Sequence, residues 1–133
     1  MAQPMSDFGC SCCWPDAPEA AWDVRRQYDR AAILIDESHF IVAVLRCPAC
    51  DQHFVSIFTE SIDWNGGNDP QYWTVMPLTK EEVGRLASLR DRLGEADLNA
   101  LPSDRKSLQR NYPADAEQPT LAWGRGIHIG PHD

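Results

Sequence analysis

Two short cysteine pairs are the feature of this sequence that most limits how the chain can fold. Two residues separate Cys10 from Cys13, and two residues separate Cys47 from Cys50. This spacing lets one tight loop turn two thiolates toward the same tetrahedral ion, and two such loops complete a four-ligand site. We therefore expect a metal ion to fasten the N-terminal loop to the segment around Cys47.

A fifth cysteine, Cys12, leaves the choice of ligands in the first loop open. Cys10 with Cys13, Cys10 with Cys12, and Cys12 with Cys13 are all available pairs, and the spacing favours the first. His53 follows Cys50 by three residues and is an alternate ligand if one cysteine stays free. A histidine at the start of a strand more often packs half-exposed, so the four-cysteine set is preferred.

Other roles for the cysteines compete with metal binding. A disulfide framework conflicts with the odd number of cysteines, which is five, and with a reducing cytosol. A thioredoxin-like dithiol needs its first cysteine at the N-terminus of a helix, whereas strand-forming residues follow Cys50. Buried, reduced thiols that pack as small hydrophobes are the remaining alternative.

Strand-forming segments flank the second cysteine pair. Residues 39–46 and 53–60 are rich in β-branched and aromatic side chains, which predicts an antiparallel hairpin with the metal loop at its turn. Both faces of the second segment carry apolar side chains, so we expect this hairpin to be central to the fold.

The sequence Cys47-Pro-Ala-Cys50 at the tip of this hairpin resembles the knuckles of zinc-ribbon and rubredoxin-type proteins. The resemblance is local. These families usually place glycine directly after the second cysteine, where this chain has Asp51. The resemblance implies a structural Zn²⁺ ion and no particular activity.

One helix is clearly signalled downstream. A capping box at Thr79 and Glu82, with Leu78 placed to contact Val83, predicts that the helix starts at Thr79. Its apolar stripe extends over residues 79–93, before Gly94. We also expect a short helix within residues 19–30, strands at 31–35 and 72–76, and an edge strand within 120–129.

These elements predict a single α+β domain over residues 1–133. A small antiparallel sheet of three or four strands, carrying the zinc-knuckle hairpin, packs against one main helix. The N-terminus, residues 1–20, is predicted to be a loop, and the C-terminal segment, residues 102–133, is predicted to be irregular.

The charge distribution limits the partners. The net charge is −8, and residues 1–77 hold 11 acidic and 4 basic residues. Four thiolates around one Zn²⁺ ion deepen the charge to about −10. Phosphate binding needs clustered basic residues, and the densest group is only Arg25, Arg26 and Arg30. We therefore expect no nucleic acid as partner and, if a protein binds, a basic one.

The chain carries no signal for a membrane or for secretion. No apolar run approaches the roughly 20 residues that cross a bilayer. Residues 1–13 have neither the basic start nor the apolar middle of a secretion signal. We therefore expect a cytoplasmic protein that spans no membrane.

Residues 60–73 combine carboxylates with aromatic rings and form the best candidate surface outside the cysteines. Such a surface can bind a cation, a carbohydrate or a basic peptide, and paired carboxylates can carry out acid and base chemistry. In the alternative interpretation the aspartates cap turns and the tryptophans close a small core. The candidate binding residues are Glu60, Asp63, Trp64, Asp69, Tyr72 and Trp73.

The leading functional hypothesis is a small acidic protein with a structural zinc ion that acts as a non-enzymatic protein-interaction module. One version of it is an inhibitor or immunity-type protein for a basic partner. The alternative is a metal-assisted hydrolase that uses Glu60, Asp63 and Asp69 with an additional ion. The sequence has no nucleophile elbow, phosphate loop or dinucleotide fingerprint, so we assign no catalytic residue.

Overall fold

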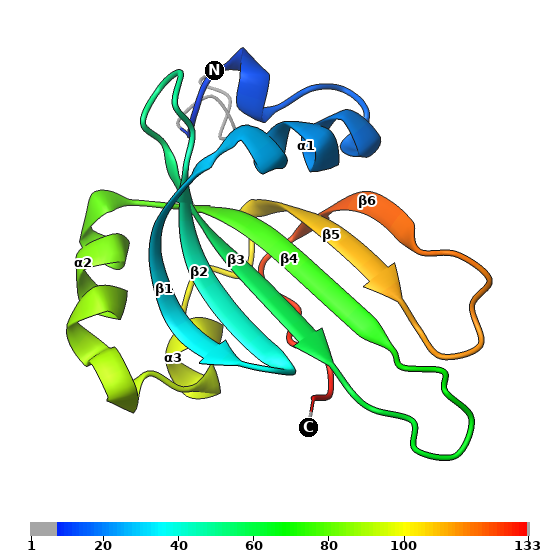
Figure 1. Cartoon of the computed structure of the whole chain (residues 1–133). Helices are drawn as coiled ribbons and strands as arrows, with labels where there is room; N and C mark the ends of the chain where they lie inside the picture. The colour runs from blue at the N-terminus through cyan, green and yellow to red at the C-terminus, as the bar shows by residue number, and fades with distance from the viewer. Residues whose placement is uncertain (1–7, 133) are drawn as a thin grey trace.

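The computed structural model describes residues 8–132 and contains a six-stranded antiparallel sheet whose strands follow in chain order (Figure 1). The strands are β1 (Asp29–Glu37), β2 (Phe40–Arg46), β3 (His53–Glu60), β4 (Gln71–Leu78), β5 (Lys106–Tyr112) and β6 (Thr120–Arg125). The helices are α1 (Pro18–Val24), α2 (Lys80–Leu89) and α3 (Glu95–Asn99), with short 3-10 turns η2 (Ser11–Cys13), η3 (Arg25–Gln27) and η4 (Arg90–Arg92).

The expected small sheet of three or four strands against one main helix is wrong. The sheet has six strands, and α2, with 10 residues, is one of several short helices beside it. The segment 102–133, expected to be irregular, contributes β5 and β6. Strand β5 is mostly polar, and its buried residues Ser107 and Leu108 are neighbours on opposite faces. It therefore lacks the apolar alternation that marks a half-buried strand.

The central hairpin is confirmed. Strands β2 and β3 pair from Phe40 opposite Thr59 to Arg46 opposite His53, so the second cysteine loop forms the turn between them. Strand β6 confirms the expected edge strand.

The helix expected within residues 19–30 is shorter than predicted. Helix α1 ends at Val24, and strand β1 already begins at Asp29. The start of α2 is confirmed by both halves of its capping box. Glu82 N donates to Thr79 Oγ1 at 3.1 Å, and Thr79 N donates to Glu82 Oε1 at 2.8 Å. Residues 1–7 of the expected N-terminal loop lie outside the described residues.

Each face of the sheet carries a separate apolar core. The first core joins the sheet to α2, Leu93, α3 and the segment after β6, and its buried side chains include Val42, Val55, Ile57, Met76, Leu78, Leu86 and Leu98. The second core joins the sheet to the first cysteine loop and α1, and its buried members are Cys13, Ala21, Trp22, Cys47, Phe54, Val75 and Leu108. In Figure 1, α1 lies above the strands, near the tip of the β2–β3 hairpin, and α2 and α3 lie at the side. No helix in residues 8–132 is long and apolar enough to cross a membrane.

Candidate metal centre

Tight backbone turns present the two cysteine pairs. In the first loop, η2 forms as Cys13 N donates to Cys10 O at 2.9 Å. In the second, Asp51 N donates to Cys47 O at 2.8 Å, and Cys47 N donates to the carbonyl oxygen of Gln52 at 2.9 Å. Both turns bring the first and last cysteine of a pair to the same side of the loop, as the two-residue spacing predicts.

Asp51 takes the backbone conformation for which zinc knuckles usually use glycine. Its φ is 64°, in the left-handed region that glycine adopts without strain and that aspartate tolerates better than most residues. Arg46, the last residue of β2, holds the Asp51 carboxylate and also bonds to Asp29 at the start of β1. The departure from the family pattern therefore preserves the turn.

The four thiols of Cys10, Cys13, Cys47 and Cys50 lie within 4.8 Å of one another. Cys13 Sγ and Cys50 Sγ are 3.9 Å apart. A zinc–sulfur distance of about 2.3 Å places two thiolates of a tetrahedron about 3.8 Å apart, whereas a disulfide holds its sulfurs at about 2.05 Å. The cluster can therefore hold a metal ion, and the Cys13–Cys50 distance is close to that of two thiolates on one tetrahedral ion.

Burial differs around the cluster. Cys13 and Cys47 are only 5% and 2% exposed, Cys10 is half-buried, and Cys50 is exposed. Burial raises the pKa of the Cys13 thiol to about 12. Burial also opposes ionisation of Cys10, but the backbone N–H groups of Cys12 and Cys13 and the Cys50 thiol outweigh it and lower the Cys10 pKa to about 7. A buried thiol such as Cys13 ionises when a cation compensates its charge, so metal binding releases protons and is weakened by acid.

Two neighbouring side chains support the cluster. The Tyr28 side chain hydrogen-bonds to the Cys13 thiol, and its ring stacks on Phe54 with centroids 5.2 Å apart. Gln52 links the two loops, because its Oε1 accepts from Gly9 N at 3.1 Å while its Nε2 donates to the carbonyl oxygen of Leu78 at 2.7 Å. Partners of this kind orient metal ligands.

Sequence reasoning missed both supporting residues. The position of Gln52, two residues after the second cysteine pair, was the only available signal for its role. Nothing in the sequence connects Tyr28 to the cysteines, since their contact depends on where β1 begins.

The alternate ligands are not brought into the cluster. Cys12 is exposed and lies outside it, and His53 sits on β3 opposite Arg46 and Leu78. Within residues 8–132, the four cysteines are the one group of three or more ligating side chains close enough to share an ion. The structure thus brings together the ligand set that spacing favours.

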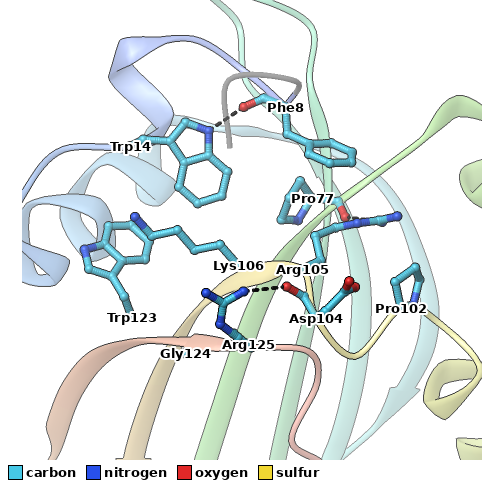
Figure 2. A pocket seen from close by; sticks show the side chains of 10 residues that line it. All are labelled: Phe8, Trp14, Pro77, Pro102, Asp104, Arg105, Lys106, Trp123, Gly124 and Arg125. Atoms are coloured by element: carbon cyan, nitrogen blue, oxygen red, sulfur yellow. Dashed lines mark hydrogen bonds between the residues drawn. The ribbon is translucent and has the colours of Figure 1, made fainter. Parts of the chain in front are cut away.

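Phe8 and Trp14, on either side of the first cysteine loop, form part of the wall of a cavity of about 630 Å³ (Figure 2). Trp14, directly after the loop, lies 5.6 Å from the ring of Trp123, and Lys106 Nζ is 4.3 Å from the Trp123 centroid. The other cations of this cavity contact protein groups too. Arg105 pairs with Glu82 at 2.7 Å and Arg125 donates to the carbonyl oxygen of Asp104 at 3.1 Å. The cations of this cavity are thus already engaged by the protein.

The predicted acidic loop is held together by its own carboxylates. Asp63 accepts hydrogen bonds from the backbone N–H groups of Asn65, Gly66 and Asn68 at 3.0–3.3 Å. These N–H groups lower the pKa of Asp63. Asp69 in turn accepts from Asp63 N at 2.8 Å. Both aspartates therefore act as turn caps.

The other predicted binding residues each contact a different part of the protein. Glu60 accepts from Gln71 at 2.8 Å and lies 3.1 Å from His39. Trp73 packs edge-on against Trp22, with centroids 5.0 Å apart, and donates to Ser56 Oγ at 2.9 Å. Tyr72 packs against His128. Trp64 is 85% exposed. The six residues do not form one continuous site, and their role in binding stays a prediction.

Comparison with known proteins adds no family. No family model, no curated protein and no solved structure matches this chain. The resemblance to zinc knuckles therefore rests on the four cysteines, the two turns that present them and the left-handed residue that closes the second turn.

Proposed function

We propose that this protein is a non-catalytic binding protein whose fold is held together by a structural zinc ion. The observation that carries the proposal is the closed set of four cysteine thiols within 4.8 Å of one another. Four soft thiolates in tetrahedral arrangement favour Zn²⁺ over harder cations. Structural zinc sites use four protein ligands, whereas catalytic sites keep one position for water or substrate.

The position of the cluster supports a structural role. Cys13 and Cys47 belong to the second apolar core, together with Trp22 and Phe54. An ion shared by the two loops therefore fastens the N-terminal segment onto the sheet where that core forms. Metal affinity for a folded site then adds directly to folding free energy.

The hydrolase alternative has less support. Of its carboxylates, Asp63 and Asp69 accept from backbone N–H groups of their own loop and Glu60 contacts Gln71 and His39, and none of the three joins a group of ligands in residues 8–132. The exposed ring of Trp64 beside these acids suits contact with another protein better than catalysis. The net charge of −8 supports a basic partner, and an inhibitor or immunity-type role remains one version of this proposal.

Metal analysis tests the proposal. Protein purified without added metal is expected to contain close to one zinc per chain by inductively coupled plasma mass spectrometry. Cys47→Ser removes a buried ligand and is expected to lose the metal, whereas Cys12→Ser removes an exposed thiol outside the cluster and serves as the matched control. A metal-free wild-type protein, or equal zinc in the two variants, would overturn the proposal.

A further inference from the structure

The second face of the sheet is covered over only part of its width. Helix α1 packs over β5 and β6, and the face over β1, β2 and β3 is left as a groove of about 600 Å³. The floor of the groove is mainly apolar, and its residues are Ile33, Ile41, Ala43, Leu45, Ser56, Phe58 and Trp73. Ile33 is 47% exposed there.

Arginines line one side of this groove. Arg25, Arg26 and Arg30 are among its lining residues, and we call the floor and these three residues the arginine groove. The Arg25 guanidinium lies 3.3 Å from the ring centroid of Trp22 and 5.0 Å from that of Trp73, so it is held against the two tryptophans.

The positive charge of this groove lacks partners inside the protein. Within residues 8–132, no carboxylate forms an ion pair with Arg25, Arg26 or Arg30. The Arg25 Nε atom is buried and has no hydrogen-bond partner in the part of the chain that the structure describes. Burial, followed by the neighbouring charges of Arg26 and Arg110, lowers the pKa of Arg25 to about 10, against the opposing effect of Asp23. Unpaired guanidinium groups are therefore kept together in a chain whose net charge is −8.

The cavity in Figure 2 also combines cations with tryptophans, but both of its arginines donate hydrogen bonds to protein oxygens, Arg105 to Glu82 and Arg125 to the carbonyl oxygen of Asp104. Its Arg105 has a carboxylate partner, Glu82, and both side chains are 12% exposed. Its Lys106 sits over the rings of Trp123 and Trp14. The arginine groove is thus the place where an external anion would supply what the protein lacks.

We propose that the arginine groove docks an acidic segment of a partner protein. The carboxylates of that segment pair with the arginines, and its apolar side chains cover the floor beside Ile33. Asp36 is the one acid that lines the groove, so the lining carries three positive charges and one negative charge. This inference rests on the proposed binding role but assigns a second kind of partner: the net charge of −8 favours a basic partner for the surface as a whole, whereas this groove favours an acidic segment.

Two observations favour an acidic peptide over nucleic acid. The aromatic rings that line the groove, Tyr28, Phe58 and Trp73, already pack against rings of the protein, whereas single-stranded nucleic acid binds by stacking its bases on open aromatic platforms. A long polyanion also extends beyond the groove and meets the net negative charge of the remaining surface, which a short acidic segment does not.

Peptide arrays provide the first test. Full-length, zinc-loaded protein is applied to ten-residue peptides built from Asp, Glu, Ile, Leu, Val and Phe, and to a matched array with Lys and Arg in place of the acids. We expect retention on the acidic array only. The best peptide, labelled with fluorescein, is then titrated by fluorescence anisotropy, and its affinity is expected to fall as NaCl rises.

Variants locate the binding surface. Arg26 and Arg30 are both exposed, so the double variant Arg26→Ala/Arg30→Ala is expected to keep its melting temperature and to bind the peptide at least about tenfold more weakly. The matched control, Lys106→Ala/Arg125→Ala, removes the same charge from the cavity in Figure 2 and is expected to bind like the wild type. Ile33→Glu places a negative charge on the floor, which repels the carboxylates of the peptide, and is expected to weaken binding as well.

Several results would overturn the inference: equal retention on the basic array, no retention on the acidic one, loss of binding in the control pair instead of the arginine pair, or tighter binding to an oligo(dT) probe. The zinc measurement tests a separate proposal, so its outcome does not depend on peptide binding. If zinc-loaded protein does not bind acidic peptides, only the proposed docking site in the arginine groove is refuted. If protein purified without metal binds them, only the proposed zinc ion is refuted.

Discussion

Removal of the metal is the perturbation whose effect follows most directly from the structure. An ion shared by Cys13 and Cys50 cross-links positions 37 residues apart. Treated as a chain cross-link, it removes about 4 kcal/mol of conformational entropy from the unfolded state at 25 °C. The free energy of unfolding of a domain of this size is about 5–15 kcal/mol. Chelation is therefore expected to remove a large share of the stability.

The expected size of the effect is measurable by thermal unfolding. For 133 residues the entropy of unfolding is about 280 cal/mol/K, so a loss of about 4 kcal/mol lowers the melting temperature by about 14 °C. Circular dichroism with and without a zinc chelator gives this difference, and Cys12→Ser should show the same drop as the wild type. A decrease below about 3 °C, with metal loss confirmed by mass spectrometry, would refute the idea that the ion fastens the N-terminal segment to the sheet.

Three further predictions concern single side chains. Glu82→Gln breaks a buried pair with Arg105 and is expected to cost about 3 kcal/mol in urea unfolding at pH 7. Burial opposes ionisation of Glu82, but the hydrogen bond from Arg105 outweighs it and lowers the Glu82 pKa. The stabilisation from the pair is therefore fully present above the ordinary pKa of 4.5 and is lost as pH falls through the lowered pKa. An equal cost of the substitution at pH 2 would contradict this assignment. Asp63→Ala should speed hydrogen exchange in its turn without changing zinc content, and loss of zinc would count against the capping role. Asp51→Gly should keep the metal and the melting temperature, whereas Asp51→Val should lose about 1 kcal/mol or more at its φ of 64°; equal stability of the two would contradict a left-handed requirement.

The four-cysteine cluster was predictable because its geometry is local. The spacing between Cys10 and Cys13, and between Cys47 and Cys50, fixes which thiols one turn can present together. The β-branched segments around the second pair then place it at a hairpin tip. The prediction that the two loops lie together followed from the fact that one metal ion takes four thiolate ligands.

The sheet was not predictable to the same degree, because its outer strand pairs lack a local signal. Strand β5 is held by its register with β4 and β6, with Leu108 opposite both Val75 and Trp123, and not by an apolar alternation of its own. Arg110 lies on this strand and reaches Trp22 from there. Arg25 and Arg26 are neighbours in the sequence, whereas Arg110 joins them at Trp22 only in the folded sheet.

The metal and the open groove have a common origin in how the second face is covered. Among residues 8–132, the first face receives α2, α3 and the segment after β6, whereas the second receives only the seven-residue α1 and a short cysteine loop. So short a cover buries little apolar surface, and isolated helices of this length are not stable in water. The proposed ion, held by the buried thiols of Cys13 and Cys47, would take the place of a longer helix at this position. A cover held by a metal can be small, and a small cover leaves the face over β1, β2 and β3 accessible to a partner.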